Sequence, residues 1–521
     1  MMWRDLRDEG TSLFSKKSIV DSLHQDIAEN FYPERANFTA KHTIGEEFGT
    51  YLYSSYPLIA RRELGNALST MSRPQGQKWF HMGLEDEDRE DQSAKQWMQQ
   101  KTDIQRRIIY NTQSRFVRAM KEADHDWATF GQAAISVELN RRRDGLFYRD
   151  WHLRDMAWAE GWDGKVDRFW RKWKPTNWQL QQYFGKDALH PDCNKSDNKN
   201  KETNVMHIFV PGDYCDNPAK NVSYYIDMDH EHVIEEKPMV YGYYVLPRWV
   251  TVSDSQYAYS PAVICALPDG RLYQDITRIL LEAGQRAVDP PMVVVEDQLK
   301  SSMDLQAGGV TVVSATFDRR LGEVMTPVKS DKSGLGFGLE MNDRTQAMLA
   351  KAFYLDKLDL PRGQEMTAYE AGIRYQEYIR AILPIFEPKE QEMEGGVMEL
   401  TFDILFRHGA FGSVQDIPQS LQGQSPQFKF VSPLSKAIEE KDANLFNEVV
   451  QVMAQAREID PMAVSNININ KASRDAVLGT GASVDWLNDE DQVLASQNAA
   501  RQQQQAAQEL ELTQQAKEVM Q

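Results

Sequence analysis

The strongest candidate for metal chemistry is the run Asp229-His230-Glu231-His232, which is followed by Glu235 and Glu236. Two histidines at positions i and i+2 lie on the same face of a strand, where their ring nitrogens could bind a transition metal. The stretch from Asp227 to Glu236, however, is polar and charged and lies between two predicted strands, which favours a solvated turn. Asp124-His125-Asp126, near a predicted helix end, allows the same two interpretations. The sequence therefore predicts no metal site.

The other residue types that could do chemistry form no recognisable catalytic set. Ten scattered histidines allow a Ser/His/Asp or Cys/His combination on paper, but no spacing singles one out. The sequence contains no Gly-x-x-x-x-Gly-Lys-Ser/Thr loop, so the phosphate cradle of an ATPase is missing. The glycines of Gly334 to Gly338 do not match a dinucleotide fingerprint and predict a flexible loop. We therefore expect no catalytic residues, no cofactor and no enzyme activity.

The cysteines and the hydropathy pattern narrow the class of protein. Cys193, Cys215 and Cys265 are too few and too scattered for a disulfide framework, so we expect reduced thiols. With 521 residues, 41% of them hydrophobic, the chain has room for several domains with sizeable cores. No apolar run approaches the roughly 20 residues that span a bilayer, and the first residues lack the apolar core of a secretory signal. We expect a protein made in a cytoplasm and not placed in a membrane.

The charge balance is acidic. The chain carries 77 acidic and 59 basic side chains, a net charge of −18. Proteins that bind nucleic acid tightly neutralise phosphates with Lys and Arg, so this balance argues against tight binding to DNA or RNA. It is compatible with a channel through which DNA slides, because tight binding there would hinder movement.

The first half of the chain alternates between helical and extended patterns. Helices are predicted by apolar spacing over 12–32, 57–71, two within 95–130, and one from Lys174 to a stop at Gly185. Strands are predicted over 133–139, within 151–173, and at 205–210, 222–226 and 241–249. Residues 190–204 are predicted to be a mobile polar loop. This mixture, with helices dominating the whole chain, indicates an α+β fold that is mainly α-helical.

The middle of the chain is predicted to hold two helices around an insert. The first helix, 269–288, places apolar residues on one face: Leu272, Ile276, Ile279, Leu280, Ala283 and Ala287. Its other face carries charges of alternating sign: Arg271, Asp275, Arg278, Glu282 and Arg286. Arg278–Glu282 and Glu282–Arg286 could pair within the helix, or the charges could reach a neighbouring chain.

The segments after this helix are predicted in order. Residues 292–340 are expected to form strands and loops, and 342–356 a second helix. A short irregular loop leads to Thr367-Ala368-Tyr369-Glu370, a capping box that begins a further helix. Pro384 should interrupt that helix, which resumes and ends near His408-Gly409. The last 90 residues are expected to be helical, with a Gln/Ala-rich tail.

Five stretches, in order along the chain, resemble one known family. The most specific is Arg362 to Glu370, which runs on to Pro384 and then to Thr401-Phe402-Asp403-Ile404-Leu405. The second runs from Val245-Leu246-Pro247-Arg248-Trp249 to Ala287-Val288-Asp289-Pro290-Pro291. Weaker matches are Phe130 to Ala134, Asp163 to Asp167 and Phe430 to Leu434. Together they resemble the portal, or head-to-tail connecting, proteins of podoviruses, which are short-tailed bacteriophages.

The resemblance implies the fold and its division into parts. It implies the phage portal fold, in which a cyclic ring of about twelve copies surrounds a central channel. The implied parts are a wing (1–265), two stem helices (266–291 and 341–356), a clip (292–340), a tunnel loop (357–366), a long wing helix with its return (367–431) and a crown with the Gln-rich tail (432–521). Lys357, Arg362 and Gln364 of the tunnel loop would face DNA, and Arg271, Asp275, Arg278, Glu282 and Arg286 would lie between subunits.

The resemblance also implies partners and a place in the virion. The ring would sit at one capsid vertex, where genomic double-stranded DNA is packaged and ejected. It would contact the terminase large subunit, tail adaptor and nozzle proteins, the major capsid protein and a scaffold protein. The alternatives are a metal-dependent phage nuclease that uses scattered acidic residues, and a capsid or scaffold protein. Hydrolysis with Mg²⁺ would distinguish the first, and shells in place of rings the second.

Overall fold

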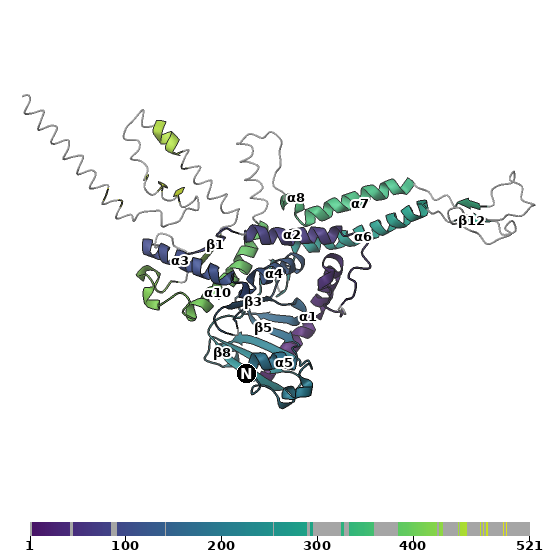
Figure 1. Ribbon diagram of the computed structural model, residues 1–521. Helices are drawn as coiled ribbons and strands as arrows, with labels where there is room; N and C mark the ends of the chain where they lie inside the picture. The colour runs from purple at the N-terminus through teal and green to yellow at the C-terminus, as the bar shows by residue number, and fades with distance from the viewer. Residues whose placement is uncertain are drawn as a thin grey trace, which may run out of the picture.

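The computed structural model describes residues 3–41, 45–74, 76–84, 91–140, 142–253, 255–288, 292–294, 325–327, 333–358, 384–424 and 427–430, with short pieces beyond residue 445. These residues form an α+β body from which a long helical hairpin projects (Figure 1). Among the described residues, no helix is both long and apolar enough to cross a membrane.

Four helices form the first part of the body: α1 (Trp3–Phe31), α2 (Tyr56–Ser72), α3 (Gln92–Ile109) and α4 (Phe116–Phe130). The predicted helices are confirmed, although α1 begins nine residues earlier than expected. Large apolar side chains of α4, including Trp127 and Phe130, are buried in the main core. Gly131 ends α4 in the left-handed region at φ 73°, and a Cβ there would lie 2.0 Å from the Tyr259 carbonyl carbon. Glycine is therefore required at the predicted change from helix to strand.

A five-stranded antiparallel sheet forms the second part of the body. Its strands, in spatial order, are β4 (Met156–Glu160), β5 (Val166–Trp173), β6 (Val205–Pro211), β7 (Asn221–Asp227) and β8 (His232–Met239). Helix α1 packs Leu6 and Phe14 against one group of sheet residues. Helix α5 (Asn177–Phe184) packs Leu180 against another, which includes Val205 and Tyr225. Thr176 and Gln179 form a capping box at the start of α5. Gly185 ends the helix, as the sequence predicted.

Two predictions in this region are wrong. The connection expected from Asp227 to Glu236 is only a short turn, because β8 begins at His232 and pairs with β7 along its length. The loop 190–204 folds into two short 3-10 turns, Pro191–Asn194 and Ser196–Asn198, with Cys193 buried. Packing against the sheet overrides the polar composition in both segments.

Short strands join distant parts of the body. β2 (Ile135–Leu139) lies between β3 (Leu146–Asp150) and β9 (Tyr244–Val245), and β10 (Val250–Thr251) pairs with β11 (Ala258–Tyr259). β1 (Phe80–Gly83) pairs with β14 (Gln427–Phe430) across almost 350 positions of sequence, in the register Phe80 to Phe430. The described C-terminal segment is thereby attached to the N-terminal helices.

The projecting hairpin consists of α6 (Pro261–Val288) and α7 (Ser333–Ala352), with the strand pair β12 (Met292–Val294) and β13 (Met325–Pro327) beyond its end (Figure 1). The loop predicted at Gly334 to Gly338 is wrong, because these residues form the beginning of α7. The second helix also ends earlier than the predicted residue 356. Tyr354 adopts φ 56°, and a separate short helix α8 (Leu355–Leu358) follows.

The described chain resumes at Pro384. Helical residues 384–388 lead to a π-helical segment, Lys389–Gly395, and then to α10 (Gly396–Arg407). Gly395 and Gly396 lie at the junction of the two helix types. The predicted end of the helix at His408-Gly409 is confirmed. The predicted capping box at Thr367 and the crown segment 432–445 lie outside the described residues.

Four buried charged residues fix this returning segment to the first helices. Arg73 donates to Asp124 of α4 and to Glu394, with a distance of 2.7 Å between Arg73 Nη1 and Glu394 Oε1. Lys389 Nζ lies 3.1 Å from Asp124 Oδ1 and 2.9 Å from Glu394 Oε1, and it also donates to Ser72 Oγ at 2.8 Å. Two cations therefore balance two carboxylates in a site closed to water.

Replacing Lys389 should be strongly destabilising. Lys389→Met leaves two buried carboxylates opposite one guanidinium, and removing one partner of a buried ion pair costs about 3–5 kcal/mol. We expect a large fall in the thermal midpoint of the purified protein. Arg118→Met, which breaks the exposed Arg118–Glu122 pair on α4, is the matched control and should leave the midpoint unchanged. Equal effects of the two substitutions would contradict this assignment.

Candidate functional site

The base of the projecting hairpin is locked to the body by packing and by one buried amide. A Cβ at Gly270 of α6 would lie 2.9 Å from Cζ of Phe31, the last residue of α1. Helices α1 and α6 can therefore approach this closely only because residue 270 is glycine. Gln274 Oε1 accepts hydrogen bonds from the backbone N–H groups of Tyr53 and Ser54, at 2.8 and 2.9 Å. Its Nε2 donates to the Ser54 carbonyl at 2.8 Å. The direction in which the hairpin leaves the body is thereby fixed.

The two helices of the hairpin pack closely on each other. A Cβ at Gly338 would lie 2.9 Å from Leu280 Cδ2, which explains why a glycine-rich stretch forms part of α7. Nearer the body, Leu349 and Phe353 are buried, and the Phe353 ring meets the Phe31 ring at 5.4 Å. Glycine has a low helix propensity, so this part of α7 would be unstable as an isolated helix. Packing against α6 stabilises it.

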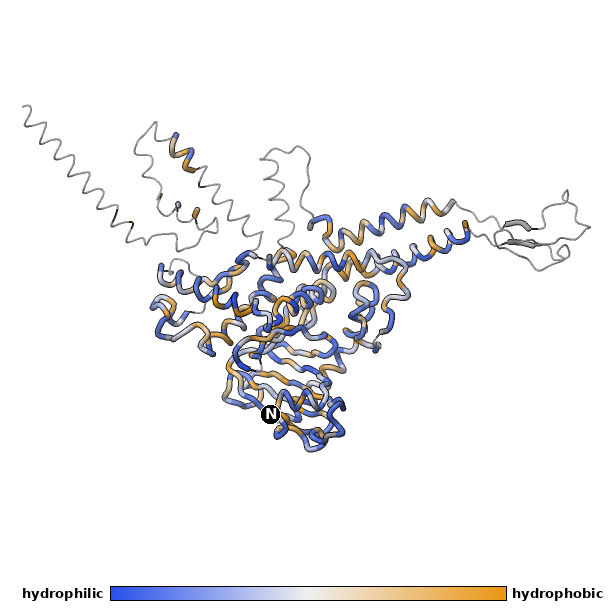
Figure 2. Tube along the Cα trace, in the orientation of Figure 1, coloured by the Kyte–Doolittle hydropathy of each residue, from blue (hydrophilic) through white to orange (hydrophobic). Residues whose placement is uncertain are grey.

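Hydrophobic residues recur along both helices of the hairpin (Figure 2), and several of their side chains are exposed. Those on α6 are Ile264, Leu272, Ile279, Leu281 and Val288, and those on α7 are Phe337, Leu339, Met341 and Met348. The predicted apolar face of α6 is not buried as a whole. Leu272 and Ile279 are exposed, and the packed face is centred on Tyr273, Thr277 and Leu280. Exposed apolar side chains therefore recur along the projecting element.

The predicted interface charges lie on the same exposed surface of α6. Arg271 pairs within the chain with Asp26 of α1, so it also fastens the hairpin base to the body. Arg278 Nη2 lies 3.6 Å from Asp275 Oδ1, one turn earlier. The two pairs predicted through Glu282 are not among the ion pairs of the described residues, and Glu282 and Arg286 are exposed.

The tunnel-loop residues can be placed only in part. Lys357 lies in α8 and is exposed, with its Nζ 5.5 Å from the centre of the Tyr354 ring. Burial raises the pKa of the Tyr354 hydroxyl. Arg362 and Gln364 lie outside the described residues.

The sequence offered two clusters that could bind a metal, and the structure brings side chains together in only one of them. In the first, Asp124-His125-Asp126, the side chains make separate contacts. Asp124 and Asp126 bind different arginines, Arg73 and Arg35, and His125 Nδ1 lies 3.1 Å from Arg61 Nη1. Burial, and then the charge of Arg61, lowers the pKa of His125 to about 4. These three side chains thus belong to separate structural contacts and do not converge on one point.

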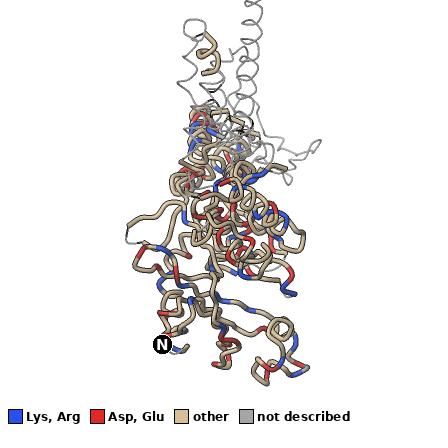
Figure 3. Tube along the Cα trace, turned by 90° about the vertical axis from the view of Figure 1, so that its left-hand side faces the viewer, with Lys and Arg blue, Asp and Glu red and all other residues tan. Residues whose placement is uncertain are grey.

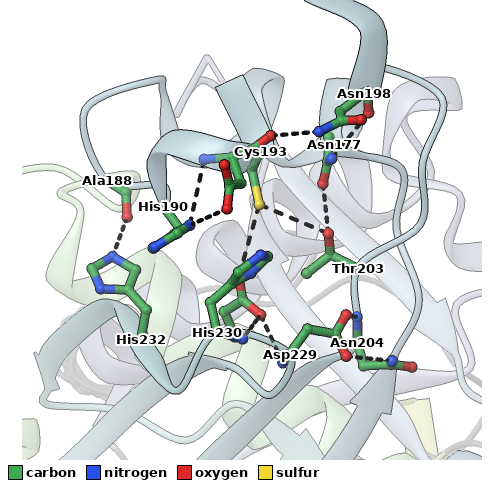
Figure 4. Close-up of polar contacts among 12 residues, drawn as sticks. Asn177, Ala188, His190, Cys193, Asn198, Thr203, Asn204, Asp229, His230 and His232 are labelled. Atoms are coloured by element: carbon green, nitrogen blue, oxygen red, sulfur yellow. Dashed lines mark hydrogen bonds and ion pairs between the residues drawn. The ribbon is translucent and has the colours of Figure 1, made fainter. Parts of the chain in front are cut away.

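The second cluster gains members that sequence reasoning missed. His230 stacks on His190, and the pair lies beside Asp192, Cys193 and Asp227 (Figure 4). Burial raises the pKa of the Cys193 thiol. His190 and Cys193 are almost 40 positions from His230, so no local spacing in the sequence indicates this convergence.

Charges of both signs are interspersed over the described chain (Figure 3). Over the full sequence, 77 acidic and 59 basic side chains give a net charge of −18. Proteins that bind nucleic acid tightly usually cluster Lys and Arg on one surface. The charges of the described residues are instead mixed in sign.

Comparison with known proteins identifies the family. The model of the family described as bacteriophage head to tail connecting protein matches residues 5–487. The probable portal protein of Bordetella phage BPP-1 is 23% identical over 98% of this chain and 92% of its own length. The portal protein of Salmonella phage epsilon15 is 21% identical over 97% and 92%.

Solved structures give more distant matches. A chain from the virion of a native gene transfer agent particle matches with a TM-score of 0.33 and 10% identity, covering 76% of this chain and 85% of that one. A chain from the neck of the empty particle matches with a TM-score of 0.32 and 11% identity, covering 78% and 89%. On the family match across nearly the whole sequence, the chain belongs to the bacteriophage head to tail connecting proteins.

Proposed function

We propose that about twelve copies of this head-to-tail connector form a closed ring at one capsid vertex, and that genomic double-stranded DNA enters and leaves through its channel. The observation that carries the proposal is the hairpin α6–α7, which exposes apolar side chains and charges of both signs along its projecting length. Soluble monomers rarely expose apolar surface of this kind, whereas a ring would bury it against the next subunit.

The interface between subunits would be heterologous, with different faces of the hairpin in contact. A head-to-tail contact that closes by rotation generates a ring and leaves no free surface. Exposed apolar residues such as Ile279 would supply the stabilisation, while Asp275, Arg278, Glu282 and Arg286 would set the register by pairing with charges of the neighbouring chain. Arg271 contributes less, because it is already paired with Asp26.

The parts of the ring would follow the family pattern. The body, residues 1–265 with 367–431, would be the wing, and α6 and α7 the stem. The strand pair β12–β13 would belong to the clip, where tail adaptor and nozzle proteins would attach. Residues 432–521 would form the crown. Terminase, the major capsid protein and a scaffold protein would contact the same ring during assembly.

A structural role fits the acidic charge balance. A DNA channel must not hold phosphates tightly, and the excess of carboxylates would keep contacts with DNA brief. We propose no catalytic activity. The competing nuclease hypothesis predicts DNA hydrolysis with Mg²⁺ or Mn²⁺, and the capsid or scaffold hypothesis predicts shells or unclosed assemblies.

An exposed apolar residue of the hairpin should be needed for assembly. Ile279, 57% exposed on α6, and Ile19, 80% exposed on α1, are a matched pair of isoleucines on helix surfaces. Ile279→Asp should shift the protein from rings to monomers at micromolar concentration, because an unpaired carboxylate would be buried between subunits. Ile19→Asp should assemble as the wild type does. Sedimentation velocity measures both, and full assembly of the Ile279→Asp variant would argue against a stem interface.

The tunnel loop can be tested separately from assembly. Replacing both Lys357 and Arg362 with Ala removes two cations that we place opposite DNA, and it should leave the ring intact. Packaging or retention of DNA in filled heads should change, and the change should depend on salt, as phosphate contacts do. Phage particles that carry the double variant and hold a full genome at wild-type yield would exclude this loop from contact with DNA.

A further inference from the structure

A compact group of metal-binding side chain types lies at one end of the five-stranded sheet (Figure 4). Cys193 comes from the first 3-10 turn, Asp227 from the last position of β7, and His230 from the turn before β8. Their ligand atoms all lie within 4.8 Å of one another. We propose that these three residues bind a Zn²⁺ ion, which ties the segment 190–198 to the β7–β8 turn. This inference does not depend on the proposed portal function.

The types of the donor atoms favour zinc over the common alkaline-earth cations. Cys thiolate, His nitrogen and Asp oxygen are the ligands of protein zinc sites, whereas Mg²⁺ and Ca²⁺ prefer oxygen alone. Cys193 and Asp227 are each only 1% exposed, and the His230 side chain is 22% exposed. The ion would thus be held from within the protein and reached past His230.

The distances already approach those of a tetrahedral site. Zn–ligand bonds of about 2.0–2.3 Å place two ligand atoms roughly 3.4–3.7 Å apart. Cys193 Sγ lies 3.8 Å from Asp227 Oδ2. Asp227 Oδ2 lies 2.7 Å from His230 Nδ1, a hydrogen bond that the ion would replace with a small widening.

The backbone holds Asp227 in place for this role. Asp227 Oδ1 accepts hydrogen bonds from the backbone N–H groups of Asp229 and His230, at 2.9 and 3.1 Å. These bonds fix the turn and leave Oδ2 directed toward Cys193 and His230. Such support of a ligand by hydrogen bonds is a regular feature of metal sites.

His190 and Asp192 form an outer group on the solvent side. The His190 ring stacks on the His230 ring at 4.3 Å and 13°, and its Nδ1 lies 3.7 Å from Asp192 Oδ2. Two parallel rings cannot both direct a nitrogen in their own planes at one ion, so His190 would have to rotate to become a ligand. We therefore assign the fourth position to water, with His190 shielding it.

Metal binding by the full-length chain tests the proposal. After treatment with EDTA, the protein is titrated with Zn²⁺, and separately with Co²⁺ to detect the absorption that a cobalt–thiolate bond produces. We expect about one ion per chain, a raised thermal midpoint with Zn²⁺, and no displacement by excess Mg²⁺ or Ca²⁺. Cys193→Ser and His230→Gln should each weaken Zn²⁺ binding at least about 100-fold, and Cys193→Ser should abolish the cobalt–thiolate absorption.

Two control variants make the outcomes distinct. Cys215→Ser changes another buried thiol, whose Sγ contacts the carbonyls of Pro211 and Gly212, and should bind Zn²⁺ as the wild type does. His190→Gln should weaken binding by no more than about tenfold. Circular dichroism without metal checks that each variant folds, and the partly exposed His230 provides a variant that leaves the core unaltered.

The proposal is overturned by either of two results. Absence of saturable Zn²⁺ binding at micromolar concentration would leave a purely structural cluster of hydrogen bonds and stacked rings. Binding that persists in Cys193→Ser but is lost in His190→Gln would place the ion at the half-buried group His190, Asp192 and His230 instead. Neither result bears on ring assembly, which the Ile279→Asp variant tests.

Discussion

The rest of the architecture depends on one cluster of buried ion pairs. It consists of Arg73, Asp124, Lys389 and Glu394. After the hairpin and α8, the next described segment begins at Pro384, more than 120 positions after the start of α6. Contacts within the hairpin do not determine where the returning segment lies. Lys389 and Glu394, both fully buried, meet Asp124 and Arg73 only when the π-helical segment packs on α2 and α4. Any other placement would leave charges buried without partners, which costs several kcal/mol.

The hairpin combines a base that is fixed to the body with an outer length whose surface is exposed. At its base the hairpin is held by Gly270 against Phe31, by Gln274 on the Tyr53–Ser54 backbone, and by Arg271 on Asp26. Farther out, its only partner among the described residues is its own second helix, and apolar side chains remain exposed there. A hairpin with a fixed base and an exposed outer surface could contact identical neighbouring subunits at a constant angle. In a ring, small errors of angle accumulate, so a fixed base favours closure over an open filament.

Local features of the sequence predict much of this fold. Apolar spacing gives α2 to within one residue at each end, and the breaker after Ser72 ends it. Thr176 and Gly185 set the limits of α5 by capping, which depends on neighbours in sequence alone. The family resemblance, carried by stretches such as Arg362 to Glu370, is confirmed by the match over residues 5–487.

Features set by distant contacts could not be predicted in this way. The segment Gly334 to Gly338 is helical because α6 packs on it, a contact that glycine propensity cannot reveal. Strand β8 carries Glu235, Glu236 and Lys237 at the edge of the sheet and therefore resembles a turn in composition. The exposure of Leu272 and Ile279 depends on which face α7 covers. Likewise, the meeting of Cys193 with His230 depends on how the sheet brings two loops together.

Electron microscopy of the purified wild-type protein tests the central claim most directly. A connector predicts closed rings of uniform size with an open central channel, and class averages viewed along the axis should show about twelve repeated subunits. The α6–α7 hairpins should surround the channel, with the sheet-containing bodies at the outer edge. Monomers alone, open filaments or closed shells at the same concentration would contradict the account.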